Sequence, residues 1–197
     1  MNQKLSELDP GDKSTDVGDE RRRRHDALCA LRHALVEEER VIRQAAASTE
    51  AAASTAMWLG ASLADLATVT GKSRQAARKR WPSLGVVHRR RLWLGNHVDE
   101  IRWAVRVVLE NQADIVVVDR GVFDELASLD ARVGRDFDET AVQGTVDAAE
   151  RWHILDRVVT SVLRGLVESA ETTSGQAEYA VFGAKGIVGY YDHASEG

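Results

Sequence analysis

The chain of 197 residues contains one cysteine, Cys29, and only two prolines. A single cysteine excludes an internal disulfide and any zinc cluster that needs several cysteines. Cys29 lies between apolar neighbours in a segment with helical periodicity, so we expect a buried small residue and not a reactive thiol. The scarcity of proline, combined with long stretches of helical period, predicts a mainly α fold.

Long hydrophobic runs are also missing. The longest, such as residues 115–118, are far too short to cross a bilayer, and the polar N-terminus lacks the apolar core of a secretory signal. We therefore expect a cytoplasmic protein that does not enter the membrane.

The sequence shows no arrangement typical of an enzyme. Its histidines do not stand at metal-ligand spacing with carboxylates, and the glycines near the C-terminus do not form a dinucleotide-binding loop. We expect no catalytic residues, no metal and no cofactor. The histidines considered are His25, His33, His88, His97, His153 and His193.

Acidic residues are absent from Leu66 to Val98, although the whole chain has a formal charge of -5. Crowded like charges repel each other, so this segment favours a polyanionic partner such as double-stranded DNA. A solvated basic face with no partner is the alternative, and charge alone does not separate the two. The cations in the segment are Lys72, Arg74, Arg78, Lys79, Arg80, Arg89, Arg90 and Arg91.

Residues 62–81 have the pattern of two short helices joined at a glycine. Ser62 is a suitable N-cap for the first helix, and Asp65 can complete a capping box with it. Gly71 lies in the turn, where a left-handed backbone is needed, and Ser73 can cap the second helix. Local chemistry therefore predicts where both helices begin.

The same pattern divides each helix into an inner and an outer face. Small Ala67 and Ala77 lie where the two helices would cross closely, and Trp81 would anchor the end of the second helix in a core. Helical geometry then turns four polar side chains outward, namely Arg74, Gln75, Arg78 and Lys79.

The outward side chains have the chemistry of base recognition. Arginine can form a bidentate pair with guanine, and glutamine can do so with adenine. Lys72 and Arg80 lie near the helix flanks, where we expect them to contact phosphates. The run Arg89–Arg91 would clamp the DNA backbone beside the groove or reach the minor groove, with a solvated basic turn as the alternative.

Residues 71–81, GKSRQAARKRW, resemble the helix-turn-helix of bacterial regulators whose recognition helix reads G-V-S-R-Q-A-A-x-x-R-F. The resemblance covers about thirty residues, and the chain departs from it at Thr70 and Lys72, where apolar side chains are usual. It implies a three-helix head with residues 50–59 as first helix, and insertion of helix 73–81 into the major groove. Its implied DNA-binding residues, together with the neighbouring basic run, are Lys72, Ser73, Arg74, Gln75, Arg78, Lys79, Arg80, Arg89, Arg90 and Arg91.

The fold expected is this head flanked by long helices, with a small C-terminal β-hairpin. A narrow apolar stripe in residues 28–45 favours a coiled-coil dimer contact, with packing inside the chain as the alternative. A second long helix, starting at an N-cap on Asp138 and running to Ala170, would be another subunit contact. The segments expected are a disordered polar tail with a basic end (1–24), an N-terminal helical segment (25–59), the head and basic extension (60–95), a helical dimerisation or regulatory domain (96–174) and a hairpin or extended tail (175–197).

Together these patterns predict a sequence-specific DNA-binding protein, namely a homodimeric transcriptional regulator. Two other functions stay open. One is a helical adaptor that binds an acidic protein, and the other is a DNA-binding protein of plasmid or chromosome partition or of replication control.

Overall fold

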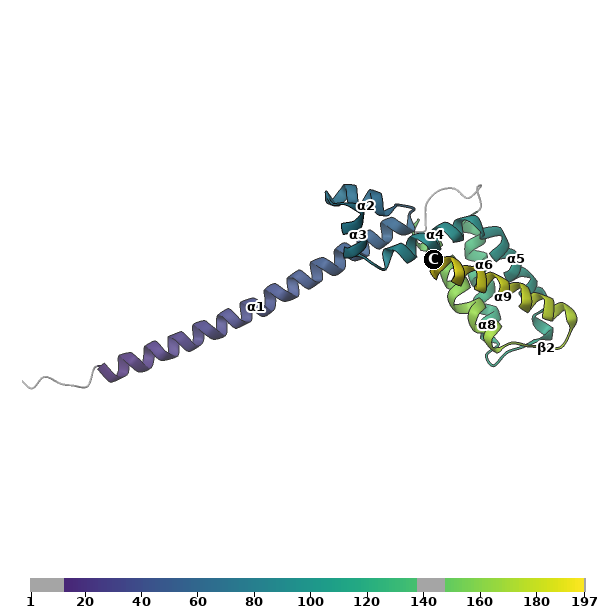
Figure 1. The fold of residues 1–197 in the computed structure, drawn as a ribbon. Helices are drawn as coiled ribbons and strands as arrows, with labels where there is room; N and C mark the ends of the chain where they lie inside the picture. Colours follow the sequence, from purple (N-terminus) through teal and green to yellow (C-terminus); the bar gives the residue numbers. More distant parts are fainter. Residues whose placement is uncertain (1–12, 138–147, 197) are drawn as a thin grey trace, which may run out of the picture. The chain divides into compact units, whose positions relative to one another are not determined.

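The computed structural model describes residues 13–137 and 148–196, and it is mainly α-helical with a small two-strand antiparallel sheet (Figure 1). The mainly α prediction is therefore confirmed. The chain divides into two compact units, Met1–Thr49 and Glu50–Gly197. Their boundary falls inside helix α1, Lys13–Trp58.

In the first unit, the described residues form the N-terminal part of α1. The helix already runs from Lys13, so the prediction of a disordered tail over residues 1–24 is wrong for residues 13–24. Alternating charges one turn apart stabilise this region, as in the ion pair between Arg23 and Asp19 (2.7 Å). Residues 1–12 of the expected tail lie outside the described residues. Cys29 is exposed and not buried, because the described side chains of residues 20–49 have no core around them.

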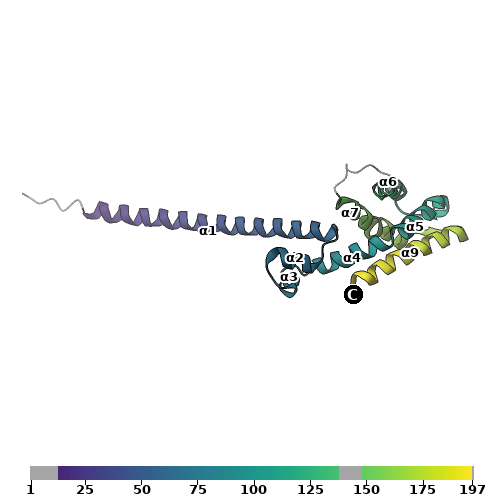
Figure 2. The same ribbon diagram turned by 90° about the horizontal axis from the view of Figure 1, so that it is seen from above.

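The second unit begins with the last turns of α1, followed by α2 (Leu63–Thr70) and α3 (Arg74–Arg80), which lie side by side (Figures 1 and 2). A further helix, α4 (Leu84–Asn96), follows where we expected only a basic extension. Pro82 and Ser83 precede this helix, so they end α3 without interrupting α4.

The end of α4 and the helices that follow it build the main core. These helices are α5 (Val98–Glu110), α6 (Gly121–Asp136), α7 (Glu150–Arg157), the π-helical turn Val158–Leu163, α8 (Arg164–Ser169) and α9 (Gly175–Glu196). α5 and α6 both lie in the helical region expected over residues 96–174. A short antiparallel sheet joins β1 (Ile115–Val116), the first half of the apolar run at 115–118, to β2 (Glu171–Thr172).

The helix expected from Asp138 to Ala170 is present from Glu150 onward, whereas residues 138–147 lie outside the described residues. Its apolar stripe was expected to contact a second subunit. The described part of that stripe is instead buried in the core of its own chain, because it packs against α6 and α9. The buried residues are Ala149, Trp152, Leu155, Val159, Val162 and Leu166.

The predicted C-terminal β-hairpin is wrong, because residues 175–196 form one helix, α9 (Gly175–Glu196). This helix lies along α4 and α5 (Figures 1 and 2). The glycines that suggested the loop of this hairpin lie within the helix instead. A Cβ atom on Gly183 would lie 3.2 Å from the ring of Trp103 on α5, so the missing side chain permits close helix packing.

None of the helices that the structure describes has an apolar stretch able to span a lipid bilayer.

Candidate nucleic-acid interface

Helix α2 starts with the capping box that the sequence predicts. The backbone N–H and the hydroxyl of Ser62 donate to the Asp65 carboxylate at 2.7 and 2.8 Å, and the Asp65 N–H donates back to Ser62 Oγ at 3.2 Å. The first of these bonds, followed by the hydroxyl bond, holds the pKa of Asp65 below its usual value. The start of α2 is thereby fixed by purely local contacts.

The connection between α2 and α3 is also closed by local bonds. Gly71 has φ 63°, the left-handed conformation expected of it, and the N–H of Lys72 donates to the Ala67 carbonyl at 3.0 Å. Ser73 caps α3 by accepting from the Ala76 N–H at 3.1 Å. Thr70 donates its hydroxyl to Leu66 O at 2.8 Å. The two residues that depart from the regulator pattern therefore leave the turn closed, and the Lys72 side chain remains exposed.

A small apolar cluster supports α2 and α3 from beneath. Ala77 and Trp81 are 2% and 4% exposed, and they pack with Met57 from the last turns of α1. The alanine and tryptophan are buried as predicted. Met57 was not assigned to this core from the sequence, although its bulk after an alanine-rich stretch was the available signal. The buried members are Ala53, Met57, Leu66, Ala67, Ala77, Trp81 and Leu84.

The outer face of α3 carries the four side chains that were predicted from the sequence to point outward. All four are exposed, and none forms a hydrogen bond or ion pair with any residue that the structure describes. Arg80 is exposed too, with its guanidinium 4.9 Å from the centroid of the Trp81 ring. The structure thus brings Arg74, Gln75, Arg78 and Lys79 onto one solvent-facing surface, flanked by Lys72 and Arg80. We call these six residues the α3 surface.

The remaining basic run, Arg89–Arg91, lies on α4 and is engaged inside the second unit. Arg89 donates to the Ser195 carbonyl at 2.8 Å. Arg91 donates to the Trp58 carbonyl at 3.0 Å, and its guanidinium lies 3.2 Å from the centroid of the Trp152 ring. These arginines are half-buried, so the structure does not join them to the α3 surface in one exposed patch.

Arg90 belongs to the same internal network. Its guanidinium lies 5.5 Å from the centroid of the Tyr191 ring, and the Tyr191 hydroxyl donates to the Asp156 carboxylate. Burial, and then the bond to Asp156, raises the pKa of Tyr191 above its ordinary value. Local sequence patterns could not reveal this network, because its members come from α4, α7 and α9.

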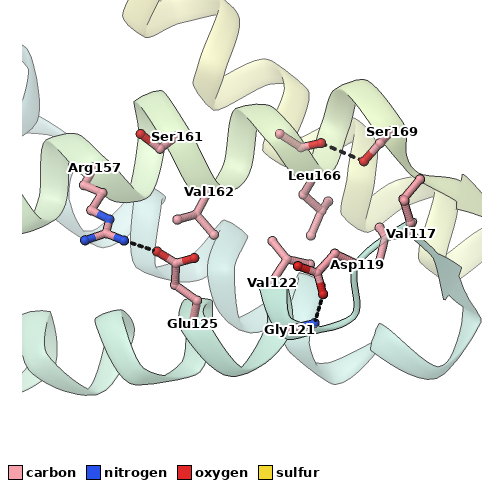
Figure 3. A pocket seen from close by; sticks show the side chains of 12 residues that line it. Val117, Asp119, Gly121, Val122, Glu125, Arg157, Ser161, Val162, Leu166 and Ser169 are labelled. Atoms are coloured by element: carbon pink, nitrogen blue, oxygen red, sulfur yellow. Dashed lines mark hydrogen bonds and ion pairs between the residues drawn. The ribbon is translucent and has the colours of Figure 1, made fainter.

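A hollow of about 760 Å³ lies between the start of α6 and the helical stretch from the end of α7 to α8 (Figure 3). Most of its polar lining is already paired within the chain. Arg157 bonds Glu125 at 2.5 Å, Asp119 accepts from the Gly121 N–H at 2.8 Å, and Ser169 donates to a main-chain carbonyl at 2.7 Å. These groups do not converge on a ligand position, so we do not assign a site here.

Within the described ranges, no group of His, Cys, Asp and Glu side chains could hold a metal ion. Comparison with protein-family models, curated proteins and solved structures finds no match to this chain. The α3 surface is therefore interpreted from its own geometry and chemistry.

Proposed function

We propose that this protein binds double-stranded DNA sequence-specifically, with α3 entering the major groove, and that it acts as a homodimeric transcriptional regulator. One observation carries the proposal. A short helix capped by Ser73 presents the side chains of Arg74, Gln75 and Arg78 to solvent with no partner among the described residues, while its other face is buried.

Rigid support is what base readout requires. Side chains that read base edges must be held in register, because a bidentate arginine or glutamine contact tolerates little displacement. The capping bonds at Ser62 and Ser73 and the buried Ala77 supply that support. The exposed cations of the α3 surface also provide sequence-independent attraction to phosphates.

Arg89–Arg91 contact other parts of the second unit, so we limit the proposed DNA-binding surface to α3 and the residues beside it. We assign base contacts to Arg74, Gln75, Arg78 and Lys79, and phosphate contacts to Lys72 and Arg80, with Ser73 fixing the start of the helix. The α4 arginines are assigned to holding the C-terminal helix and the end of α1 in place.

Selection of bound duplexes from a random-sequence pool tests this proposal. We expect an enriched sequence motif. Arg74→Ala should relax the selection at one base position of this motif and weaken binding to the specific duplex by about 1–3 kcal/mol. Binding of random duplexes should change much less. Arg106 is an exposed arginine on α5, so Arg106→Ala is the matched control and should leave the motif and the affinity for the specific duplex unchanged.

Absence of duplex binding at about 50 mM salt would refute the proposal, since electrostatic attraction is strongest there. Capture of an acidic protein under the same conditions would then favour the adaptor function. An enriched motif that Arg74→Ala and Gln75→Ala leave unchanged would show DNA binding by another surface.

A further inference from the structure

The first unit exposes a regular apolar stripe. Leu28, Leu31, Leu35 and Ile42 are 58%, 54%, 56% and 59% exposed, and Ala45 continues the same face. Their spacing alternates between three and four residues when Glu38 is included, which is the a/d pattern of a coiled coil. An isolated helix gains little stability from propensity alone, so this stripe calls for a partner helix.

We infer that α1 pairs with α1 of a second copy as an antiparallel coiled coil, in which Arg32 of each chain faces Glu39 of the other. The inference takes the homodimer from the proposed function and adds the surface, orientation and register of the pair. Charge complementarity along one flank of the stripe, where Arg32 and Glu39 lie, carries it.

A parallel pair is disfavoured by Glu38, which occupies a d position. Parallel, in-register helices would place the two Glu38 carboxylates in the same core layer, where like charges repel. The flanking g and e positions would then oppose Ala34 to Glu39 and Ala27 to Arg32, so no attractive charge pair would compensate.

An antiparallel pair whose two-fold axis passes between Val36 and Glu37 removes this conflict. Glu38 then lies opposite Leu35, Leu31 opposite Ile42, and Leu28 opposite Ala45. All six layers contain at least one apolar side chain. The two Glu38 side chains fall in different layers.

The same register creates two attractive contacts. In an antiparallel coiled coil the e positions of the two helices flank each other, and here they pair Arg32 with Glu39 twice. A shift by one heptad in either direction would instead oppose Arg32 to Arg32 or Glu39 to Glu39. Glu39 also contacts Arg43 within its own helix at 3.3 Å, which orients its carboxylate without removing its charge.

The orientation decides where the two chains leave the coiled coil. At about 1.5 Å per residue, an antiparallel pair in this register separates the two Thr49 residues by roughly 38 Å. A parallel pair would release both chains at the same end.

Charge reversal in the full chain tests the register. We expect Arg32→Glu and Glu39→Arg each to weaken dimerisation about tenfold in sedimentation experiments, because two attractive contacts become repulsive. The double variant R32E/E39R should restore the wild-type dimer. The matched control is the ion pair between Arg40 and Glu37 (2.6 Å), which lies on the outer face of the helix. R40E, E37R and their combination should leave dimerisation unchanged.

Cysteine cross-linking in a Cys29→Ser background tests the orientation. Oxidation of a mixture of Leu31→Cys and Ile42→Cys chains should join the two different chains, while neither variant cross-links efficiently alone. A monomeric chain at concentrations near 100 µM, efficient cross-linking of Leu31→Cys alone, or loss of dimer without recovery in R32E/E39R would each overturn the inference. None of these measurements involves DNA, so failure here is distinguishable from failure of the DNA-binding proposal.

Discussion

The salt dependence of DNA affinity tests the proposed contact of Lys72 with a phosphate. Its side chain is exposed beside α3, and its only hydrogen bond among the described residues is made by its backbone N–H, to Ala67 O. Lys72→Ala therefore removes one positive charge while the turn keeps its closing bond. The change isolates an electrostatic contribution from a folding one.

The magnitude follows from the number of exposed cations on the α3 surface, which are Lys72, Arg74, Arg78, Lys79 and Arg80. Each phosphate neutralised contributes about -0.9 to the slope of log affinity against log salt. If all five cations contact phosphates, raising the salt concentration from about 50 to about 200 mM should lower the DNA affinity of one chain by roughly 500-fold. Without Lys72, the same increase in salt should lower this affinity by only about 150-fold.

Fluorescence anisotropy with a labelled random duplex, titrated at several salt concentrations, measures this slope. We expect Lys72→Ala to make the slope less steep by about 0.9 per bound head, and Lys185→Ala, an exposed lysine on α9, to leave it unchanged. Identical slopes for wild type and Lys72→Ala would refute the assignment of Lys72 to a phosphate. An equal change in Lys185→Ala would show a nonspecific charge effect.

Three further predictions concern stability, each measured by thermal or urea unfolding. Asp65→Ala removes the carboxylate of the capping box and should lower the stability of the fold. Because folding lowers the pKa of Asp65, this loss should be present above pH about 4 and should vanish under more acidic conditions. Ala77→Leu should destabilise by about 1–3 kcal/mol, since the site beneath α3 is 2% exposed and closely packed, and unchanged stability would show a looser crossing. Tyr191→Phe should cost about 1–3 kcal/mol by leaving Asp156 without its donor. Since folding raises the Tyr191 pKa, wild-type stability should fall above pH about 10, and an undiminished fall in the phenylalanine variant would contradict the assignment to Tyr191.

The sequence was a good guide wherever a few neighbouring residues determine the backbone. Ser62, Asp65, Gly71 and Ser73 act on groups within about one helical turn, so their roles could be predicted without tertiary information. Helical periodicity likewise predicted the buried Ala77. The exposure of Arg74, Gln75, Arg78 and Lys79 follows from the same periodicity once the inner face is known.

The sequence misled where a residue's surroundings come from distant segments. The glycines near 183–189 were interpreted as a hairpin loop, yet Gly183 allows α9 to approach Trp103, and residues 80 positions apart cannot be paired by local rules. The apolar stripe of the helix at 150–169 was interpreted as a subunit contact, because periodicity shows that a face is buried without showing what buries it.

The sequence by itself determined the caps, the turn and the division of α3 into two faces, since these depend on hydrogen bonds and side-chain directions within a few residues. Only the tertiary structure decided which of eight clustered cations remain available. Lys72, Arg74, Arg78, Lys79 and Arg80 are exposed, whereas Arg89, Arg90 and Arg91 are half-buried against α1, α7 and α9. Charge along a chain shows where cations are concentrated, but long-range packing determines which of them face the solvent.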